Sequence, residues 1–273
     1  MKYALFALVA GVLFAADPQA ADIMKRVAEN QDREQKERSR FIYEENIRVT
    51  TRRSNGKLAR EEITDLLVTP TPAGTEKKRQ SIRGRYWHKG RYLDFSGDPV
   101  PDPDTLDGGL ISGFRDDLTN SESKDGIGKS LFPLTSDEQE NLRFELTAKQ
   151  AVAGRDAYRI RFGPRDAKEF GWTGEALIDA DELQPISVYT RMSRRIPFFI
   201  RTLAGTDVPG LGFSVKYARI DKDVWFPVSF GTEFRLHAVF FINRTITVSM
   251  ENKNFRRATA ESTIRYQDDG YHE

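Results

Sequence analysis

The chain has 273 residues, of which 38% are apolar, with 42 Lys and Arg against 41 Asp and Glu, three His and no Cys. This balance, with 12 Pro and 20 Gly spread along the chain, excludes a collagen-like repeat, a coiled coil and a wholly disordered protein. The formal charge of +1 removes the usual electrostatic argument for nucleic-acid binding, and the absence of Cys excludes disulfides, thiolate nucleophiles, Cys-based metal sites and a lipid anchor on Cys. We expect a single globular domain over residues 22–266, because a β-rich domain of this length is ordinary.

The first residues have the pattern of a secretory signal peptide. Met1–Lys2 is a short basic start, and Tyr3–Phe14 is an uncharged apolar run that ends at the small residues Ala15-Ala16. The run is too short to cross a bilayer, which takes about 20 apolar residues. We predict a signal peptide over residues 1–15, with cleavage as late as residue 21, and an exported, periplasmic mature chain. An uncleaved anchor or a buried first helix is the alternative.

A charged amphipathic helix is predicted over Asp22–Glu45. Ile23 and Val27 repeat at helical spacing within a stretch that is otherwise dense in charged residues. Asp22 is a suitable N-cap for this helix. Because only one narrow stripe is apolar, we expect the helix to lie against a larger element and its charged residues to face solvent.

From Phe41 onward the apolar residues alternate at a period of two, which is typical of half-buried strands. Turn residues such as Asn55-Gly56 and Lys89-Gly90 separate the runs, and the short connections favour antiparallel pairing. The predicted strands are 41–50, 63–68, 79–88, 91–95, 143–148, 158–162, 172–179, 186–192, 213–220, 224–230, 232–243, 245–250 and 259–266. So many strands indicate a mainly β (α+β) fold, a strongly curled antiparallel sheet or half-barrel of about 11 strands with a few covering helices. Residues 267–273 are expected to form a C-terminal tail.

Residues 96–130 are expected to leave the sheet as an irregular excursion. The segment Ser96–Asp107 is rich in Pro and Asp and cannot form regular structure, whereas 109–118 is compatible with a short helix. A second short helix is predicted at 136–142, where Ser136 and Gln139 form a capping-box pattern.

Each of the clearest predicted strands has one apolar and one polar face. In 232–243 the even positions are apolar and the odd positions are mostly charged, and 245–250 repeats the alternation. A curled sheet with an apolar inner face either encloses a cavity for an apolar ligand or is filled by helices and loops, and the pattern leaves both open. The residues expected to line such a cavity are Phe234, Leu236, Phe240, Ile246, Val248, Met250, Trp172 and Ile178.

The segment Arg194–Leu203 is the sharpest local feature of the sequence. Its Phe198-Phe199-Ile200 run is flanked by Arg residues and followed by Gly and Pro. A mobile lip at the mouth of a cavity, or a loop that touches a membrane, would show this pattern. An ordinary buried strand would show it as well, so both interpretations stay open.

No motif for catalysis or metal binding is found. His88, His237 and His272 lie on separate segments without HExxH spacing, and GxSxG is absent. Asp125–Ser130 ends like a phosphate loop but lacks its first Gly, and the Asp-rich segment 102–107 departs from an EF-hand. We predict no catalytic residue, no metal and no cofactor. A hydrolase that works through Asp or Glu would need a deep polar cleft with converging carboxylates of raised pKa.

One run of motifs in the second half suggests a family. A strand beginning near Gly154 is followed by Trp172–Asp179 and then by Leu183–Ile186. Together with the signal peptide, the charged helix and the long meander, this order resembles the outer-membrane lipoprotein-sorting superfamily, the LolA-like periplasmic carriers. The resemblance covers most of residues 22–266, and its motifs describe turns rather than reacting groups. It implies a half-barrel closed by helices around an apolar cavity for acyl chains, with no chemistry performed. No position here matches the gating Arg of that family.

We therefore predict a periplasmic, monomeric carrier that holds the acyl chains of a lipid or lipoprotein. Phe198, Phe199 and Ile200 are expected at the mouth of its cavity. Transient contact with the membrane or with envelope proteins is expected, and contact with nucleic acid is not. The alternative is an envelope protein with a filled core that binds a protein partner or a membrane surface through residues 194–203.

Overall fold

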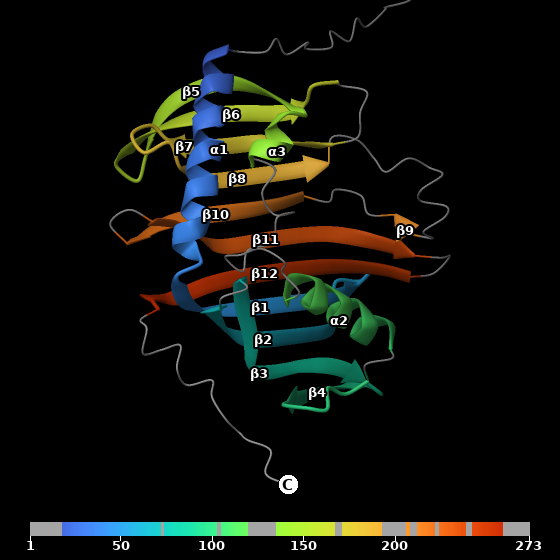
Figure 1. Cartoon of the computed structure of the whole chain (residues 1–273). Helices are drawn as coiled ribbons and strands as arrows, with labels where there is room; N and C mark the ends of the chain where they lie inside the picture. Colours follow the sequence, from blue (N-terminus) through green and yellow to red (C-terminus); the bar gives the residue numbers. More distant parts are fainter. Residues whose placement is uncertain are drawn as a thin grey trace, which may run out of the picture.

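The computed structural model describes residues 18–71, 74–102, 105–119, 135–166, 171–192, 206–207, 212–221, 224–238 and 242–258. These residues form three helices and one antiparallel sheet of twelve strands (Figure 1). The helices are α1 (Pro18–Arg38), α2 (Leu106–Thr119) and α3 (Ser136–Gln139). The strands are β1 (Phe41–Arg53), β2 (Leu58–Thr71), β3 (Gly74–His88), β4 (Arg91–Ser96), β5 (Leu142–Val152), β6 (Arg155–Pro164), β7 (Trp172–Asp179), β8 (Pro185–Met192), β9 (Thr206–Asp207), β10 (Gly212–Asp221), β11 (Val224–Ala238) and β12 (Ile242–Arg257).

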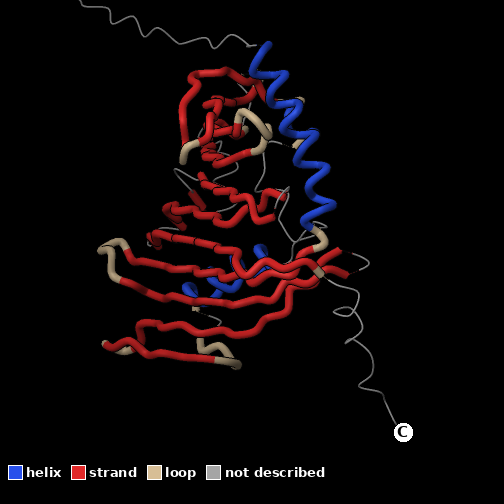
Figure 2. Tube along the Cα trace, turned by 90° about the vertical axis from the view of Figure 1, so that its left-hand side faces the viewer, coloured by secondary structure: helices blue, strands red, loops and turns tan. Residues whose placement is uncertain are grey.

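Eleven strands follow one another in the order β4-β3-β2-β1-β12-β11-β10-β8-β7-β6-β5, and β9 pairs with β11 beside this path. The last of the described strands, β12, pairs with β1, so the two halves of the chain meet in the middle of the sheet. The edge strands β4 and β5 do not pair with each other, and Figure 2 shows that the open sheet is twisted and curled. The predicted mainly β fold, with a curled antiparallel sheet of about 11 strands, is confirmed.

The first helix differs from its predicted limits at both ends. It begins at Pro18, so Asp22 lies inside the helix and is not its N-cap. Proline is well tolerated there, because the first turn of a helix leaves its backbone N–H groups without intrahelical acceptors. The helix ends at Arg38, and Phe41–Glu45 belong to β1, which pairs with β2 on one side and with β12 on the other.

Other boundaries also differ from the prediction. The helix α2 begins at Leu106, so the last two residues of the segment expected to be irregular, Leu106 and Asp107, are helical. The predicted strands 224–230 and 232–243 form one strand, β11, in which Gly231 pairs opposite Ser214 and Ser249 without a turn. The predicted break near residue 244 is wrong, because β12 begins at Ile242, which pairs with Ala238 at the end of β11, and continues to Arg257. The second short helix ends at Gln139, because Leu142 already pairs with Pro164 in β5. The predicted signal peptide, the strand 259–266 and the tail 267–273 lie outside the described residues.

The inner face of the curled sheet carries the larger of two apolar clusters, and helices lie over it. In Figure 1, α1 crosses the half of the sheet from β5 to β11, and α2 lies over β1 and β2. Ala20, Met24 and Val27 of α1 and Ile111 of α2 are fully buried in this cluster. Among the described residues, no helix is long and apolar enough to cross a membrane.

Candidate functional site

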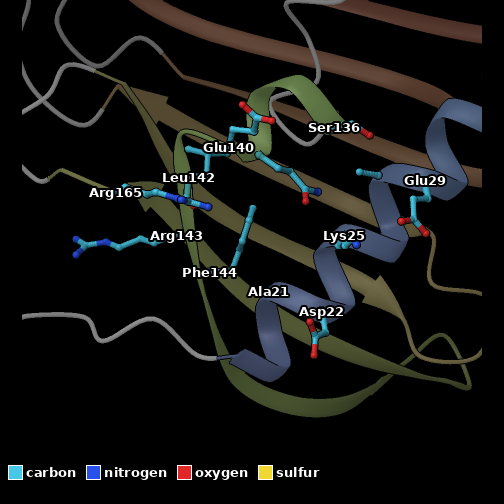
Figure 3. A pocket seen from close by; sticks show the side chains of 12 residues that line it. Ala21, Asp22, Lys25, Glu29, Ser136, Glu140, Leu142, Arg143, Phe144 and Arg165 are labelled. Atoms are coloured by element: carbon cyan, nitrogen blue, oxygen red, sulfur yellow. The ribbon is translucent and has the colours of Figure 1, made fainter.

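A pocket of about 830 Å³ opens between α1, α3 and β5 (Figure 3). Its walls come from one face of α1, from α3 and the turn after it, from the start of β5 and from the residue that follows β6. The lining residues are Ala21, Asp22, Lys25, Ala28, Glu29, Ser136, Gln139, Glu140, Leu142, Arg143, Phe144 and Arg165. A pocket of this size suits a small ligand or part of a chain-like one.

The helical repeat of α1 places one of its faces against the pocket. Ala21, Lys25 and Ala28 are spaced by four and three residues and therefore lie on the same side of the helix. The neighbouring stripe, which includes Met24 and Val27, packs on the sheet with no exposed surface. Because Ala21 and Ala28 have small side chains, they leave space between the helix and the edge of the sheet.

Side-chain hydrogen bonds attach α3 to α1 across the pocket. The Gln139 Nε2 donates to the Met24 carbonyl oxygen at 2.7 Å, and the Ser136 hydroxyl donates to Asp32 Oδ2 at 2.5 Å. These bonds fix one wall of the pocket on the helix that forms the other.

The pocket has an apolar floor and a charged rim. Leu142 and Phe144 form part of the floor, and both also belong to the main apolar cluster of the inner face. The Arg165 guanidinium is fixed beside this floor by a hydrogen bond of 3.1 Å that its Nε donates to the Leu142 carbonyl oxygen. The charged lining residues are Asp22, Lys25, Glu29, Glu140, Arg143 and Arg165. The arrangement suits a ligand with an apolar part and a polar end.

The side chains predicted to line a cavity lie mainly in the packed core. Ile178, Ile246, Val248 and Met250 are buried, as are Phe234 and Leu236, and all six belong to the main apolar cluster. Trp172 is half-buried against that cluster, with its ring 5.3 Å from the Phe213 ring. None of these residues lines the pocket beside α3. Phe240, Phe198, Phe199 and Ile200 lie outside the described residues.

The structure thus shows a pocket that the sequence reasoning missed. Its floor is connected to the predicted set only through the shared apolar cluster. The one available signal was the pair of small residues Ala21 and Ala28, seven positions apart beside the apolar stripe of α1.

Two ion pairs hold α2 over the other half of the inner face. Asp107 accepts from Arg244 of β12 at 2.7 and 3.0 Å, and the Arg115 Nη1 donates to Glu62 of β2 at 2.6 Å. Phe114 of α2 packs edge-on against Phe234, with ring centres 5.4 Å apart. We call α2 with these contacts the α2 cover.

A buried guanidinium lies beside the α2 cover. Arg60 of β2 is 1% exposed, and its Nη1 donates to the Pro101 carbonyl oxygen at 2.9 Å. Its Nη2 is 3.8 Å from Glu62 Oε2, and among the described residues neither Nη2 nor Nε has a hydrogen-bond partner. Burial lowers the pKa of the Arg60 guanidinium from its ordinary value, partly offset by Glu62.

Two carboxyl groups have a raised pKa, and they lie in separate networks. Burial raises the pKa of Glu34 to about 7, although its carboxylate accepts from the Trp225 backbone N–H at 2.9 Å and from Gln184 at 2.7 Å. Burial also raises the pKa of Glu45, which accepts from the Lys77 ammonium at 3.0 Å. Neither carboxyl lines the pocket. In the part of the chain that the structure describes, no three His, Asp or Glu side chains are grouped as metal ligands.

Solved structures that match the chain were found, whereas no protein-family model and no curated protein sequence matches it. A domain from Vibrio parahaemolyticus assigned to outer-membrane lipoprotein sorting is 13% identical, with 87% of this chain and 94% of that one covered and a TM-score of 0.36. A DUF1329-family protein from Desulfovibrio piger is 14% identical, with coverages of 88% and 94% and a TM-score of 0.34. A LolA-superfamily protein from Nitrosomonas europaea is 8% identical, with coverages of 90% and 95% and a TM-score of 0.32.

Proposed function

We propose that the protein is an exported carrier that binds an acyl chain of a lipid or lipoprotein and releases it chemically unchanged. The observation that carries the proposal is the pocket between α1, α3 and β5, whose floor is continuous with the apolar inner face of the curled sheet. The LolA-like order of sequence motifs supports the same kind of function. In this proposal the chain contributes apolar surface and polar contacts at the rim, and no reacting group.

The acyl chain is proposed to lie on Leu142 and Phe144, with its polar end at the charged rim. Burial of apolar surface contributes roughly 0.8 kcal/mol for each methylene group, before the cost of ordering the chain. Several methylene groups in the pocket are therefore enough for measurable affinity.

The predicted lining residues on β11 and β12 are proposed to contact the acyl chain only when the α2 cover separates from the sheet. Phe234 lies under Phe114 in the described structure, and separation of α2 would expose it together with its neighbours in the cluster. A longer acyl chain is then proposed to extend from the pocket along the inner face toward Ile246 and Val248.

Signal cleavage after residue 15 suits this arrangement. Cleavage at residue 21 would remove Ala20, which is fully buried in the main cluster, and Ala21, which lines the pocket. The earlier cleavage keeps Pro18–Arg38 whole.

The test is native mass spectrometry of the mature protein purified from a bacterial periplasm, followed by solvent extraction and lipid identification. A near-stoichiometric acyl ligand is expected. Ala21→Trp places a bulky side chain in the pocket from an exposed position and is expected to abolish ligand retention. Arg26→Trp, at an exposed position of α1 outside the pocket, is the matched control and is expected to retain the ligand.

Two results would contradict the proposal. A clean apo mass together with no binding of a fluorescent fatty acid would favour the filled-core, partner-binding alternative. Equal ligand retention by Ala21→Trp and Arg26→Trp would show that the acyl chain does not lie in this pocket.

A further inference from the structure

The ends of the β1–β2 and β3–β4 hairpins form a basic surface with two exposed aromatic rings. Both turns lie at the same end of the sheet, on the right in Figure 1, because β1 pairs with β2 and β2 with β3 in antiparallel register. Residues 52–58 and 85–92 contain six Lys and Arg and no Asp or Glu, although the whole chain has a formal charge of only +1. We call these two segments the basic end.

Most of the positive charge at the basic end is not neutralised within the described structure. Arg85 pairs with Glu61, with its Nε 3.4 Å from the carboxylate, and Arg52 donates to the Gly56 carbonyl oxygen at 3.3 Å. Among the described residues, the other four cations have no ion-pair partner. These are Arg53, Lys57, Lys89 and Arg91.

Two aromatic side chains stand next to these cations on the surface. Trp87 is 36% exposed and Tyr92 is 44% exposed, and their rings meet edge to face with centres 5.0 Å apart. The Arg53 guanidinium lies 5.8 Å from the centre of the Trp87 ring, and the Arg85 guanidinium lies 5.9 Å from that of Tyr92. The Tyr92 hydroxyl donates to the Leu58 carbonyl oxygen at 3.1 Å, which ties the two hairpins together.

From this arrangement we propose that the basic end docks on an anionic membrane surface. Trp and Tyr side chains favour the headgroup level of a bilayer, where an apolar ring and a polar atom are both accommodated. Lys and Arg beside them are attracted to anionic lipids by roughly 1 kcal/mol each close to the surface. An aromatic pair within a cluster of unpaired cations therefore matches an anionic bilayer in both charge and polarity.

The geometry fits a membrane better than a nucleic acid. Stacking of bases needs open, flat aromatic faces. Here the rings meet edge to face, and a guanidinium lies over one face of each. Insertion of ring edges among headgroups needs no such platform.

The basic end also adjoins the α2 cover. Arg53 pairs opposite Arg244 in the β1–β12 ladder, and Arg244 is the residue that holds Asp107 of α2. If the proposed carrier function holds, docking here brings the cover close to the bilayer, where acyl chains are exchanged.

The test is co-sedimentation of the mature protein with vesicles of phosphatidylcholine alone or with about 30% phosphatidylglycerol. Binding is expected only to the anionic vesicles and is expected to weaken with added salt. The triple variant Lys57→Ser, Lys89→Asn, Arg91→Ser should bind at least about tenfold more weakly. Asn is chosen at position 89 because that residue has a φ of 45°, which Asn tolerates well.

A matched triple variant controls for net charge. Lys149→Ser, Arg191→Ser, Lys216→Ser removes the same charge from exposed positions on β5, β8 and β10 and should bind like the wild type. Equal binding by the two triple variants would overturn the proposal, as would equal binding of the wild type to neutral and anionic vesicles. Binding to a DNA duplex with no binding to anionic vesicles would instead assign the basic end to nucleic acid.

Trp87 supplies a second readout that does not depend on charge. Of the three Trp residues, Trp225 is buried and Trp172 is half-buried, so contact with headgroups should change mainly the emission of Trp87. A blue shift on anionic vesicles is expected in the wild type and is expected to vanish in Trp87→Phe. Because acyl-chain retention is measured separately by native mass spectrometry, failure of docking and failure of the carrier proposal give different results.

Discussion

The two longer helices cover the same face of the sheet but are attached to it in different ways. The contact stripe of α1 runs through positions 20, 24, 27, 31, 34 and 38, and every residue of this stripe is buried. Its first half is apolar, and its second half joins the sheet through a buried network of Gln31, Glu34 and Arg38 with Gln184 and Trp225.

The helix α2 is attached to the sheet by fewer buried side chains than α1. Ile111 is fully buried, whereas the Asp107 and Arg244 side chains remain 19% and 18% exposed. Partly exposed ion pairs contribute less than a buried apolar stripe, because water and salt screen them. The second ion pair of α2, Arg115–Glu62, is less exposed, at 16% and 3%. From this comparison we predict that α1 is the more firmly attached helix and that α2 separates from the sheet at a lower cost in free energy.

The largest effect is expected from shortening the fully buried side chain that anchors each helix. Met24→Ala in α1 should lower the free energy of global unfolding by about 2–5 kcal/mol, because it leaves a cavity between the helix and the sheet. Ile111→Ala in α2 should lower it by less, because α2 can detach locally. Urea unfolding measures the global change, and amide hydrogen exchange measures the protection of α2. Equal global losses with no faster exchange in α2 would show that both helices are equally integral to the fold.

A second prediction concerns the polar half of the α1 stripe. The Glu34 pKa of about 7 lies above the ordinary 4.5, so the folded state binds this proton more tightly than the unfolded state. The contribution of Glu34 to stability is therefore complete below about pH 4.5 and declines by up to about 3 kcal/mol as the pH rises to 7. Urea unfolding of the wild type and of Glu34→Gln across this range isolates the effect, which should be absent from the variant.

Glu34→Gln is a suitable control because the neighbouring amides can reverse their direction. The introduced side-chain amide would accept from the Trp225 N–H and donate to Gln184, which would in turn donate to the Gln31 oxygen. The cost of this reversal is the long hydrogen bond of 3.4 Å that Arg38 now donates to that oxygen. The same pH dependence in the wild type and in the variant would assign the titration to another group.

The smallest expected effect is the coupling within the Asp107–Arg244 pair. A double-mutant cycle with Asp107→Asn and Arg244→Gln, read from amide exchange in α2, should give about 1 kcal/mol. The matched pair Arg159–Glu175 on β6 and β7 has a similar N···O distance of 2.8 Å, but its side chains are 37% and 36% exposed. Its coupling, read from urea unfolding, should be about 0.3 kcal/mol. If the coupling between Asp107 and Arg244 were as small as that between Arg159 and Glu175, this ion pair would not be what holds the α2 cover in place.

The local patterns of the sequence predicted the sheet well and the helix contacts less well. Strict alternation placed Phe234, Leu236, Ile246, Val248 and Met250 on the inner face, where the structure has them buried. The charged stretch after Val27 was expected to face solvent, and this prediction is wrong for Gln31, Glu34 and Arg38. Their acceptors and donors lie about 150 or more positions away in the chain, at Gln184 and Trp225, so no local pattern could reveal them.

Local sequence patterns were sufficient to predict the mainly β fold, the antiparallel order of neighbouring strands and the apolar face of each clear strand. The reason is that alternation and turn residues act between positions close in the chain. Only the folded chain shows that β12 pairs with β1, that a buried polar network joins α1 to the sheet, and that a pocket opens beside α3. These features depend on how elements far apart in the chain meet, because the volume left between packed side chains is set by all of the surrounding elements together.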